Sequence, residues 1–273
     1  MATHGSAFPI AKLALNNNVP PILMASLRMG MVMLLLIPFW KFKIPDKKYL
    51  KSLILFSISM GVMVYVFMNL SLKHSSFISP IIIGAQLAVP FAVLLSAKMI
   101  GESISAKKWM YVILAFVGII IVFFDPELKN NLLGLFFASL MALFFAIAQV
   151  YSRQLKELSL IILNAYTGFF GFFVLIVVSF FVEGEVIINI KNINFESWIL
   201  ISYQAVIVSL FAHMSMFYLY KFYTVGQIFP FYSLFPIFGI ILTFLIFGEI
   251  PSILFFIGSF IVISSVILLQ KTK

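Results

Sequence analysis

The chain has 273 residues, of which 63% are apolar and only 10% charged, against roughly 45–50% and about 25% in ordinary globular proteins. A soluble protein of this size cannot bury that much apolar surface, so the composition excludes a soluble domain and indicates a protein surrounded by lipid. The net charge of +9 lies in short connectors and points to membrane topology rather than nucleic acid, and the absence of cysteine excludes disulfides, thiol catalysis and Cys-ligated metals.

Nine apolar runs are long enough, or nearly so, to cross about 30 Å of hydrocarbon as helices, which takes about 20 residues. Membrane-spanning strands would instead show short alternating segments, so we predict helices. Turn-forming residues separate the runs, as at Asn16–Asn18 and at Asp125-Pro126. The predicted spans are 20–40, 49–72, 77–99, 107–124, 132–152, 158–182, 198–219, 225–247 and 252–270.

A shorter apolar segment, residues 1–15, precedes these runs. As a helix it would be only about 22 Å long at 1.5 Å per residue. It lacks the basic start and clean apolar stretch of a signal peptide. We therefore expect a first spanning helix that is short or truncated.

Positive charge is shared unequally between the two sets of connectors. If both termini face the cytoplasm, thirteen Lys and Arg residues lie inside and four outside, which with Arg28 in a span accounts for all 18. This bias predicts a multi-pass protein of the bacterial cytoplasmic (inner) membrane with both termini in the cytoplasm. The inner set is Lys41, Lys43, Lys47, Lys48, Lys51, Lys98, Lys107, Lys108, Arg153, Lys156, Lys221, Lys271 and Lys273; the outer set is Lys12, Lys73, Lys129 and Lys191.

A short motif recurs in the two halves of the chain. Met-Ile-Gly-Glu at 99–102 returns as Ile-Phe-Gly-Glu at 246–249, and each copy ends one long run and precedes another. Five helices per half, an odd number, would invert one half relative to the other, as in many secondary transporters with a midplane site. We predict an all-α membrane protein of ten transmembrane helices, in two inverted five-helix repeats at 1–124 and 132–270.

Several motifs follow one another in a recognisable order. They are Gly5-Ser6-Ala7-Phe8-Pro9, Lys12-Leu13-Ala14-Leu15, Val19-Pro20-Pro21, Leu27-Arg28, and the two Gly-Glu pairs with small residues (Gly118 and Ser265) sixteen positions on. In this order they resemble EamA-domain proteins of the drug/metabolite transporter superfamily, and the resemblance covers essentially the whole chain. It implies a ten-helix membrane transporter.

Details of the resemblance bear on the substrate. Gln86 and Tyr223 look most like the branch that exports cysteine-pathway metabolites and other amino acids. The chain departs from the family pattern at His4, where relatives carry Trp, and at His213, where relatives often carry a small residue. Relatives also begin earlier than this chain does.

Polar side chains inside spans are costly and therefore candidates for function. Arg28 could hold a carboxylate or phosphate with its planar fork, or instead cap carbonyls or reach the membrane surface. His213 could sense protons or contact substrate, or simply bond to a neighbouring helix. Gln86 is the strongest polar candidate, because an unpaired amide in hydrocarbon is costly. The predicted substrate-binding residues are Arg28, Tyr65, Asn69, Gln86, Gln149, Asn164, His213 and Tyr232.

Other intramembrane positions favour structural roles. The small residues Gly61, Gly168 and Gly171 are typical of helix-packing surfaces. Phe144 and Phe145 are interpreted as lipid-facing or core positions, and Glu249, at a membrane boundary, as structural. Pro90 and Pro236 are expected to kink the fourth and ninth helices in mid-span.

Missing features narrow the function. No Asp or Glu lies deep inside a predicted span, which argues against drug-cation antiport through a buried carboxylate. No HExxH, paired Asp, GxSxG or P-loop is present, so we expect no enzyme, catalytic residue, metal or cofactor.

The sequence thus predicts a secondary transporter that exports a small polar metabolite, an amino acid or derivative, by alternating access. Its partners would be that substrate and the lipid bilayer, not nucleic acid, and a homodimer stays open. A membrane-embedded enzyme or non-transporting receptor is the alternative.

Overall fold

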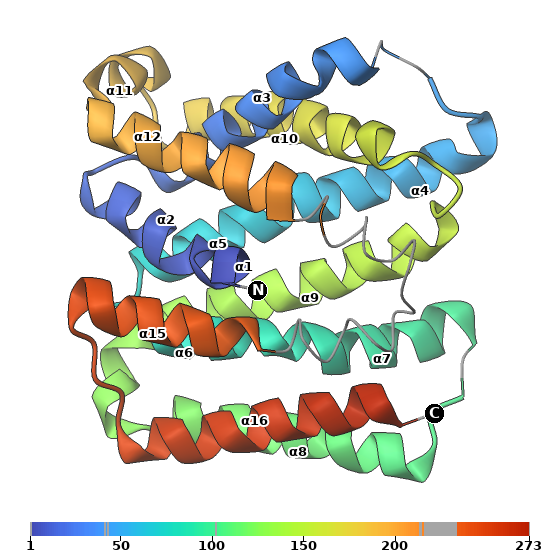
Figure 1. The fold of residues 1–273 in the computed structure, drawn as a ribbon, viewed down its shortest axis with the longest axis vertical. Helices are drawn as coiled ribbons and strands as arrows, with labels where there is room; N and C mark the ends of the chain where they lie inside the picture. Colours follow the sequence, from blue (N-terminus) through green and yellow to red (C-terminus); the bar gives the residue numbers. More distant parts are fainter. Residues whose placement is uncertain are drawn as a thin grey trace.

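The computed structural model describes residues 2–40, 42, 44–101, 103–212, 215 and 234–272, and these contain helices and no strands. The helices run roughly parallel and stack along the long axis of the molecule (Figure 1). Eight of the described helices are long and apolar enough to cross a membrane, and Phe235–Phe247 is a shorter apolar helix. The prediction of an all-helical, multi-pass membrane protein is confirmed. Of the expected span 225–247, only the part from Leu234 onward is described, so the count of ten stays a prediction.

The first half of the chain follows the predicted runs closely. Two short helices open it, and two of the later spans contain a non-α segment, π-helical in η1 and 3-10 in η2. The elements are α1 (Ala2–Gly5), α2 (Ala7–Asn16), α3 (Pro21–Trp40), α4 (Lys47–Ser57), η1 (Ile58–Met63), α5 (Val64–Lys73), α6 (Ser79–Gly84), η2 (Ala85–Leu87), α7 (Ala88–Ile100) and α8 (Ala106–Phe123).

The second half begins after the 3-10 turn η3 (Pro126–Asn131). It contains a second π-helical segment, η4, which continues α12. The elements are α9 (Leu132–Gln154), α10 (Leu160–Val182), α11 (Val186–Asn192), α12 (Phe195–Tyr203), η4 (Gln204–Ala212), α15 (Phe235–Phe247) and α16 (Ile253–Lys271).

The repeated motif ends its two helices in the same way. Gly101 caps α7 and Gly248 caps α15, with φ of 78° and 66°, in the left-handed region that glycine enters without a steric penalty. The predicted turns at Asn16–Asn18 and Asp125-Pro126 also fall between helices. The local chemistry of these residues is therefore what separates the spans.

Pairs of helices from opposite halves pack side by side. α3 lies along α10 and α8 along α16, at opposite ends of the stack (Figure 1). A Cβ added to Gly118 would lie 2.8 Å from the carbonyl oxygen of Gly258, and one added to Gly258 would lie 2.6 Å from that of Gly118. A Cβ on Gly171 would lie 2.8 Å from the carbonyl oxygen of Gly61, which confirms these two as helix-packing positions.

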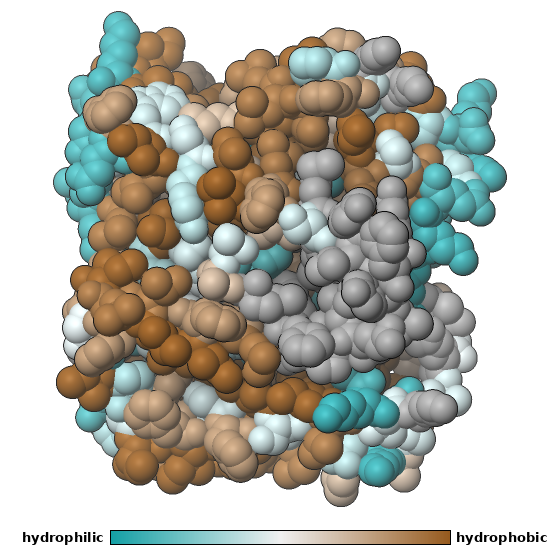
Figure 2. All heavy atoms as spheres, in the orientation of Figure 1, coloured by the Kyte–Doolittle hydropathy of each residue, from teal (hydrophilic) through white to brown (hydrophobic). Residues whose placement is uncertain are grey.

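The outer surface matches a lipid environment. Large apolar side chains such as Phe181 (79% exposed) and Phe260 (74%) point away from the core. In Figure 2, hydrophobic residues make up much of the coloured surface, while the most hydrophilic residues lie mainly along the left and right edges, near the helix ends. This distribution is the reverse of that in a soluble protein and fits a bilayer around the middle of the helices.

Two carboxylates from the second half cap helices of the first half. Glu249 accepts from the backbone N–H groups of Ile78 (2.7 Å) and Ser79 (2.8 Å) at the start of α6. Glu183 accepts in the same way from Ile22 (2.8 Å) and Leu23 (2.9 Å) at the start of α3. Helix N-termini carry unpaired donors and partial positive charge, so both contacts stabilise the ends. The structural role predicted for Glu249 is confirmed.

Lys12 caps the end of another helix, α5. Lys12 Nζ donates to the carbonyl oxygens of Leu72 and Ser75, both at 2.6 Å, where α5 ends. A cation at a helix C-terminus satisfies carbonyls that have no partner within the helix.

Fewer contacts of this kind occur at the opposite helix ends within the described residues. The Tyr49 hydroxyl donates to Glu157, and Ser52 Oγ donates to Gln154 Oε1 at 2.5 Å. The hydrogen bond from Tyr49, and then the charge of Lys48, lower the pKa of the Glu157 carboxyl. Both hydrogen bonds are exposed to solvent, so they stabilise only weakly the contact of α4 with the end of α9 and the connector that follows it.

We expect Glu249→Ala to destabilise the fold. It leaves the N–H groups of Ile78 and Ser79 unpaired, at about 1–3 kcal/mol each. A loss of about 2 kcal/mol would lower the melting temperature of the detergent-purified protein by about 4–8 °C. Glu127→Ala, at an exposed side chain, is the control and should change it little. Equal melting temperatures for the two variants would contradict a capping role for Glu249.

Candidate functional site

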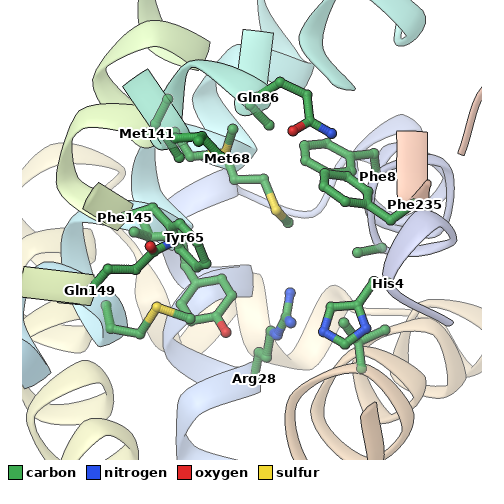
Figure 3. Close-up of a pocket in the computed structure, with 18 residues that line it drawn as sticks. His4, Phe8, Arg28, Tyr65, Met68, Gln86, Met141, Phe145, Gln149 and Phe235 are labelled. Carbon is green, nitrogen blue, oxygen red and sulfur yellow. The ribbon is translucent and has the colours of Figure 1, made fainter. Parts of the chain in front are cut away.

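A cavity of about 100 Å³ lies at the centre of the bundle, lined by both halves of the chain (Figure 3). By the same measure a single water needs about 10–15 Å³, so the cavity has room for a molecule of several heavy atoms. Its walls are mostly apolar, with Phe8, Met60, Met68, Met141, Phe145 and Phe235 as the large side chains. Its polar lining residues are His4, Arg28, Tyr65, Gln86 and Gln149.

Arg28, on α3, is buried, with only 2% of its surface exposed, and three contacts orient its guanidinium. Its Nε donates to Ser209 Oγ at 3.0 Å and its Nη1 to Gln204 Oε1 at 2.8 Å. Its Cζ lies 4.2 Å from the centre of the Tyr65 ring, a cation–π distance. Arg28 thus bonds to side chains of η4 rather than to a backbone carbonyl of the described residues, and it is buried rather than extended to the surface.

Gln204 is the residue that fixes the guanidinium. Its Nε2 donates to the carbonyl oxygen of Ala7 at 2.6 Å, so one amide joins α2 to Arg28. Next to it, Ser6 Oγ and the Tyr203 hydroxyl are hydrogen-bonded at 2.8 Å. Together these bonds tie the opening helices to α12 and η4 beside the cavity.

The charge of Arg28 has no carboxylate partner among the described residues, whose one ion pair is Lys48–Glu157 at the surface. Nη2 of Arg28 also donates to no described residue, and the guanidinium points into the cavity in Figure 3. A buried cation without a counterion is costly. The geometry therefore leaves a positively charged donor facing an apolar cavity.

Gln86 lies at the other end of the cavity in Figure 3. It belongs to η2, the short 3-10 segment between α6 and α7. Pro90, four residues later, cannot donate to the carbonyl of Gln86, and the helix is 3-10 rather than α over Ala85–Leu87. Pro236, in contrast, was expected in mid-helix and stands instead in the first turn of α15, where its missing N–H costs nothing.

The sequence profile of the EamA-like transporter family matches residues 1–124 and 132–270. The chain belongs to the EamA-like transporter family. One match covers each half, so the chain has the two-repeat architecture of the EamA-like family, a family of membrane transporters of the drug/metabolite superfamily.

The fold is also found among solved structures. This chain is similar to a solved structure described as "Crystal structure of protein". The match covers 99% of this chain and 98% of the other chain, with a TM-score of 0.57 and 13% sequence identity. At that identity the likeness shows the fold alone. None of the curated proteins gives a significant match to this EamA-like chain.

Four of the eight predicted site residues line the cavity of this EamA-like protein: Arg28, Tyr65, Gln86 and Gln149. Asn69 does not line it, and its Nδ2 donates to the carbonyl of Pro21 at 2.9 Å. Asn164 does not line it either, and its Nδ2 donates to Leu160 in its own helix at 2.8 Å. The remaining two, His213 and Tyr232, lie outside the described residues.

Sequence reasoning did not propose three residues that matter to the cavity. His4 lines it beside Arg28, and Gln204 and Ser209 hold Arg28. For His4, the sequence offered one signal, since this histidine stands where relatives carry tryptophan. Phe145, interpreted as lipid-facing or core, also lines the cavity, whereas Phe144 stacks on Phe67 with ring centres 5.6 Å apart.

A metal site has no support in the described part of the chain. There, no group of three His, Cys, Asp or Glu side chains could hold an ion.

We expect two substitutions of Gln204 to differ in their effect on stability. Gln204→Leu removes the partner of Arg28 Nη1, a buried charged donor, at about 1–3 kcal/mol, so the melting temperature should fall by about 2–4 °C for each kcal/mol. Gln204→Glu also loses the bond from Nε2 to the Ala7 carbonyl, but its carboxylate pairs with the guanidinium in a stronger, charge-assisted bond, so it should lower the melting temperature less than Gln204→Leu does. Equal destabilisation by both variants would argue against an uncompensated charge on Arg28.

Proposed function

We propose that the protein is a secondary transporter that exports a small carboxylate-bearing metabolite, an amino acid or a derivative of one, by alternating access. The observation that supports this most is the Arg28 guanidinium, buried and open to the cavity without a described carboxylate partner. A substrate carboxylate would supply the missing counterion. Family membership supports transport as the activity.

The chemistry of the guanidinium favours a planar anion. Nε and Nη1 are engaged by Ser209 and Gln204, which leaves Nη2 and the cavity side of the fork for a ligand. Arginine binds carboxylates through parallel N–H···O bonds, and these are strong where water is excluded. The apolar walls around it would hold the hydrocarbon part of such a substrate.

Alternating access is supported by the origin of the lining. Arg28, Tyr65 and Gln86 come from the first half, while Gln149 and Phe235 come from the second. A site between two repeats can face each side of the membrane in turn as the helices rock. We propose ten spans in two inverted repeats, each of five. The resemblance of Gln86 and Tyr223 to amino-acid exporters supports the outward direction.

We also propose that both termini face the cytoplasm of a bacterial inner membrane, on the thirteen-to-four distribution of positive charge. A phosphatase reporter fused after Lys47 should then be inactive, and one fused after Lys129 active. A green fluorescent reporter at each position should give the opposite pattern. An external reporter at Lys47 would overturn the orientation.

Flux into proteoliposomes of the purified protein tests the substrate class. We expect saturable uptake of leucine, and none of isoamylamine, which has the same body without the carboxylate. Gln204→Glu should reduce the apparent affinity for leucine by roughly 5- to 150-fold, because its own carboxylate occupies Arg28.

The matched control for that variant is Phe144→Leu, outside the cavity, which should transport as the parent does. Equal transport of leucine and isoamylamine by the parent would contradict a carboxylate site at Arg28. So would a parent-like affinity in Gln204→Glu.

A further inference from the structure

The amide of Gln86 is buried at the cavity wall with an unused donor. The side chain is 4% exposed, and its Nε2 has no hydrogen-bond partner among the described residues. Buried polar groups are almost always paired, so an exception calls for an explanation. Asn69 also has an unpaired oxygen, but it does not line the cavity. Two described amides, Gln86 and Gln149, line the cavity, and of these Gln86 has a fully buried donor without a partner.

The space between Gln86 and Arg28 is apolar. Figure 3 shows Met68 reaching in from one side and Phe8 with Phe235 standing on the other. The two phenyl rings are stacked, with centres 6.4 Å apart and planes 8° from parallel. The cavity thus has a cationic end, a hydrocarbon middle and a neutral amide end.

An amide complements a neutral hydrogen-bonding group better than an ion. It offers one donor and one acceptor face, as does another amide, and it carries no charge to offset that of a ligand. Among the described lining residues, Arg28 is the one Lys, Arg or carboxylate side chain, and it lies at the other end. A second carboxylate on the ligand would therefore be desolvated at Gln86 without a counterion.

We propose that the cavity selects a carboxylate whose apolar body ends in a neutral hydrogen-bonding group, and that Gln86 is the residue that recognises this far group. The proposal rests on the carboxylate site at Arg28. It narrows the substrate class to two-ended molecules, such as amino acids with a terminal amide, ester or hydroxyl, and it disfavours dicarboxylates and purely aliphatic amino acids.

Isosteric pairs of amino acids test this directly in the same proteoliposomes. Asparagine has a carboxamide where leucine has an isopropyl group of similar shape, and glutamine and homoleucine differ in the same way with one more methylene. The two lengths allow for the unknown reach of the ligand toward Gln86. Glutamate is added as the charged counterpart of glutamine.

In the parent, we expect the amide member of at least one pair to have the higher apparent affinity, by roughly 5- to 150-fold. Glutamine should likewise exceed glutamate. Gln86→Met keeps the length of the side chain and removes its hydrogen-bonding groups. In this variant the ratio of the two affinities should fall to near unity. Flux of the aliphatic member should persist, which shows that the variant is folded.

Phe144→Leu should keep the parent's preference. The assignment of Gln86 would be overturned if the parent preferred neither amide. It would also be overturned if Gln86→Met kept the preference, or if it lost transport of both members of a pair equally. Transport of leucine but not of isoamylamine, weakened by Gln204→Glu and seen together with either result, would leave the proposed function standing. Absence of any carboxylate transport by the parent would overturn the proposed function itself.

Discussion

In hydrocarbon, a backbone N–H or C=O group without a partner has no water to replace it, and this requirement organises the whole bundle. The first turns of α3 and α6 have donors that their own helices cannot satisfy. Glu183 and Glu249 satisfy them, each with both carboxylate oxygens. α3 carries Arg28, and α6 leads directly into η2 with Gln86. Both ends of the cavity are thus positioned by helices whose starts are fixed from the other half of the chain.

The same scarcity of polar partners determines the charge of the cavity. Arg28 is oriented by neutral groups, Ser209, Gln204 and the ring of Tyr65, which hold the guanidinium without cancelling its charge. A carboxylate in the place of Gln204 would have made a stable, closed pair. An amide instead leaves the charge of the guanidinium uncancelled, and the carboxylate site that we propose depends on this residue, which contacts the guanidinium through Oε1.

Hydropathy and turn chemistry predicted the helices well, because the length of an apolar run and the place of Asn, Pro and Gly are local properties. The cavity was harder to predict. Arg28 and Gln86 could be found as polar residues in apolar spans, but so could Asn164, which bonds to a carbonyl four residues earlier in its own helix. Sequence alone does not show which polar group is satisfied locally. Gln204 was not predicted as a partner of Arg28, because it begins a π-helical segment. There, a count of 3.6 residues per turn assigns side chains to the wrong face of the helix.

The cross-half caps bear on how such a bundle could move. A motion that separated residues 1–124 from 132–270 as two blocks would pull Glu183 from α3 and Glu249 from α6, and would leave four backbone donors without these partners. A motion that carries α3 together with α10, and α6 together with the end of α15, breaks none of these bonds. These bonds therefore couple the helices in mixed pairs, one from each repeat, and a division along the boundary between repeats in the sequence would break them.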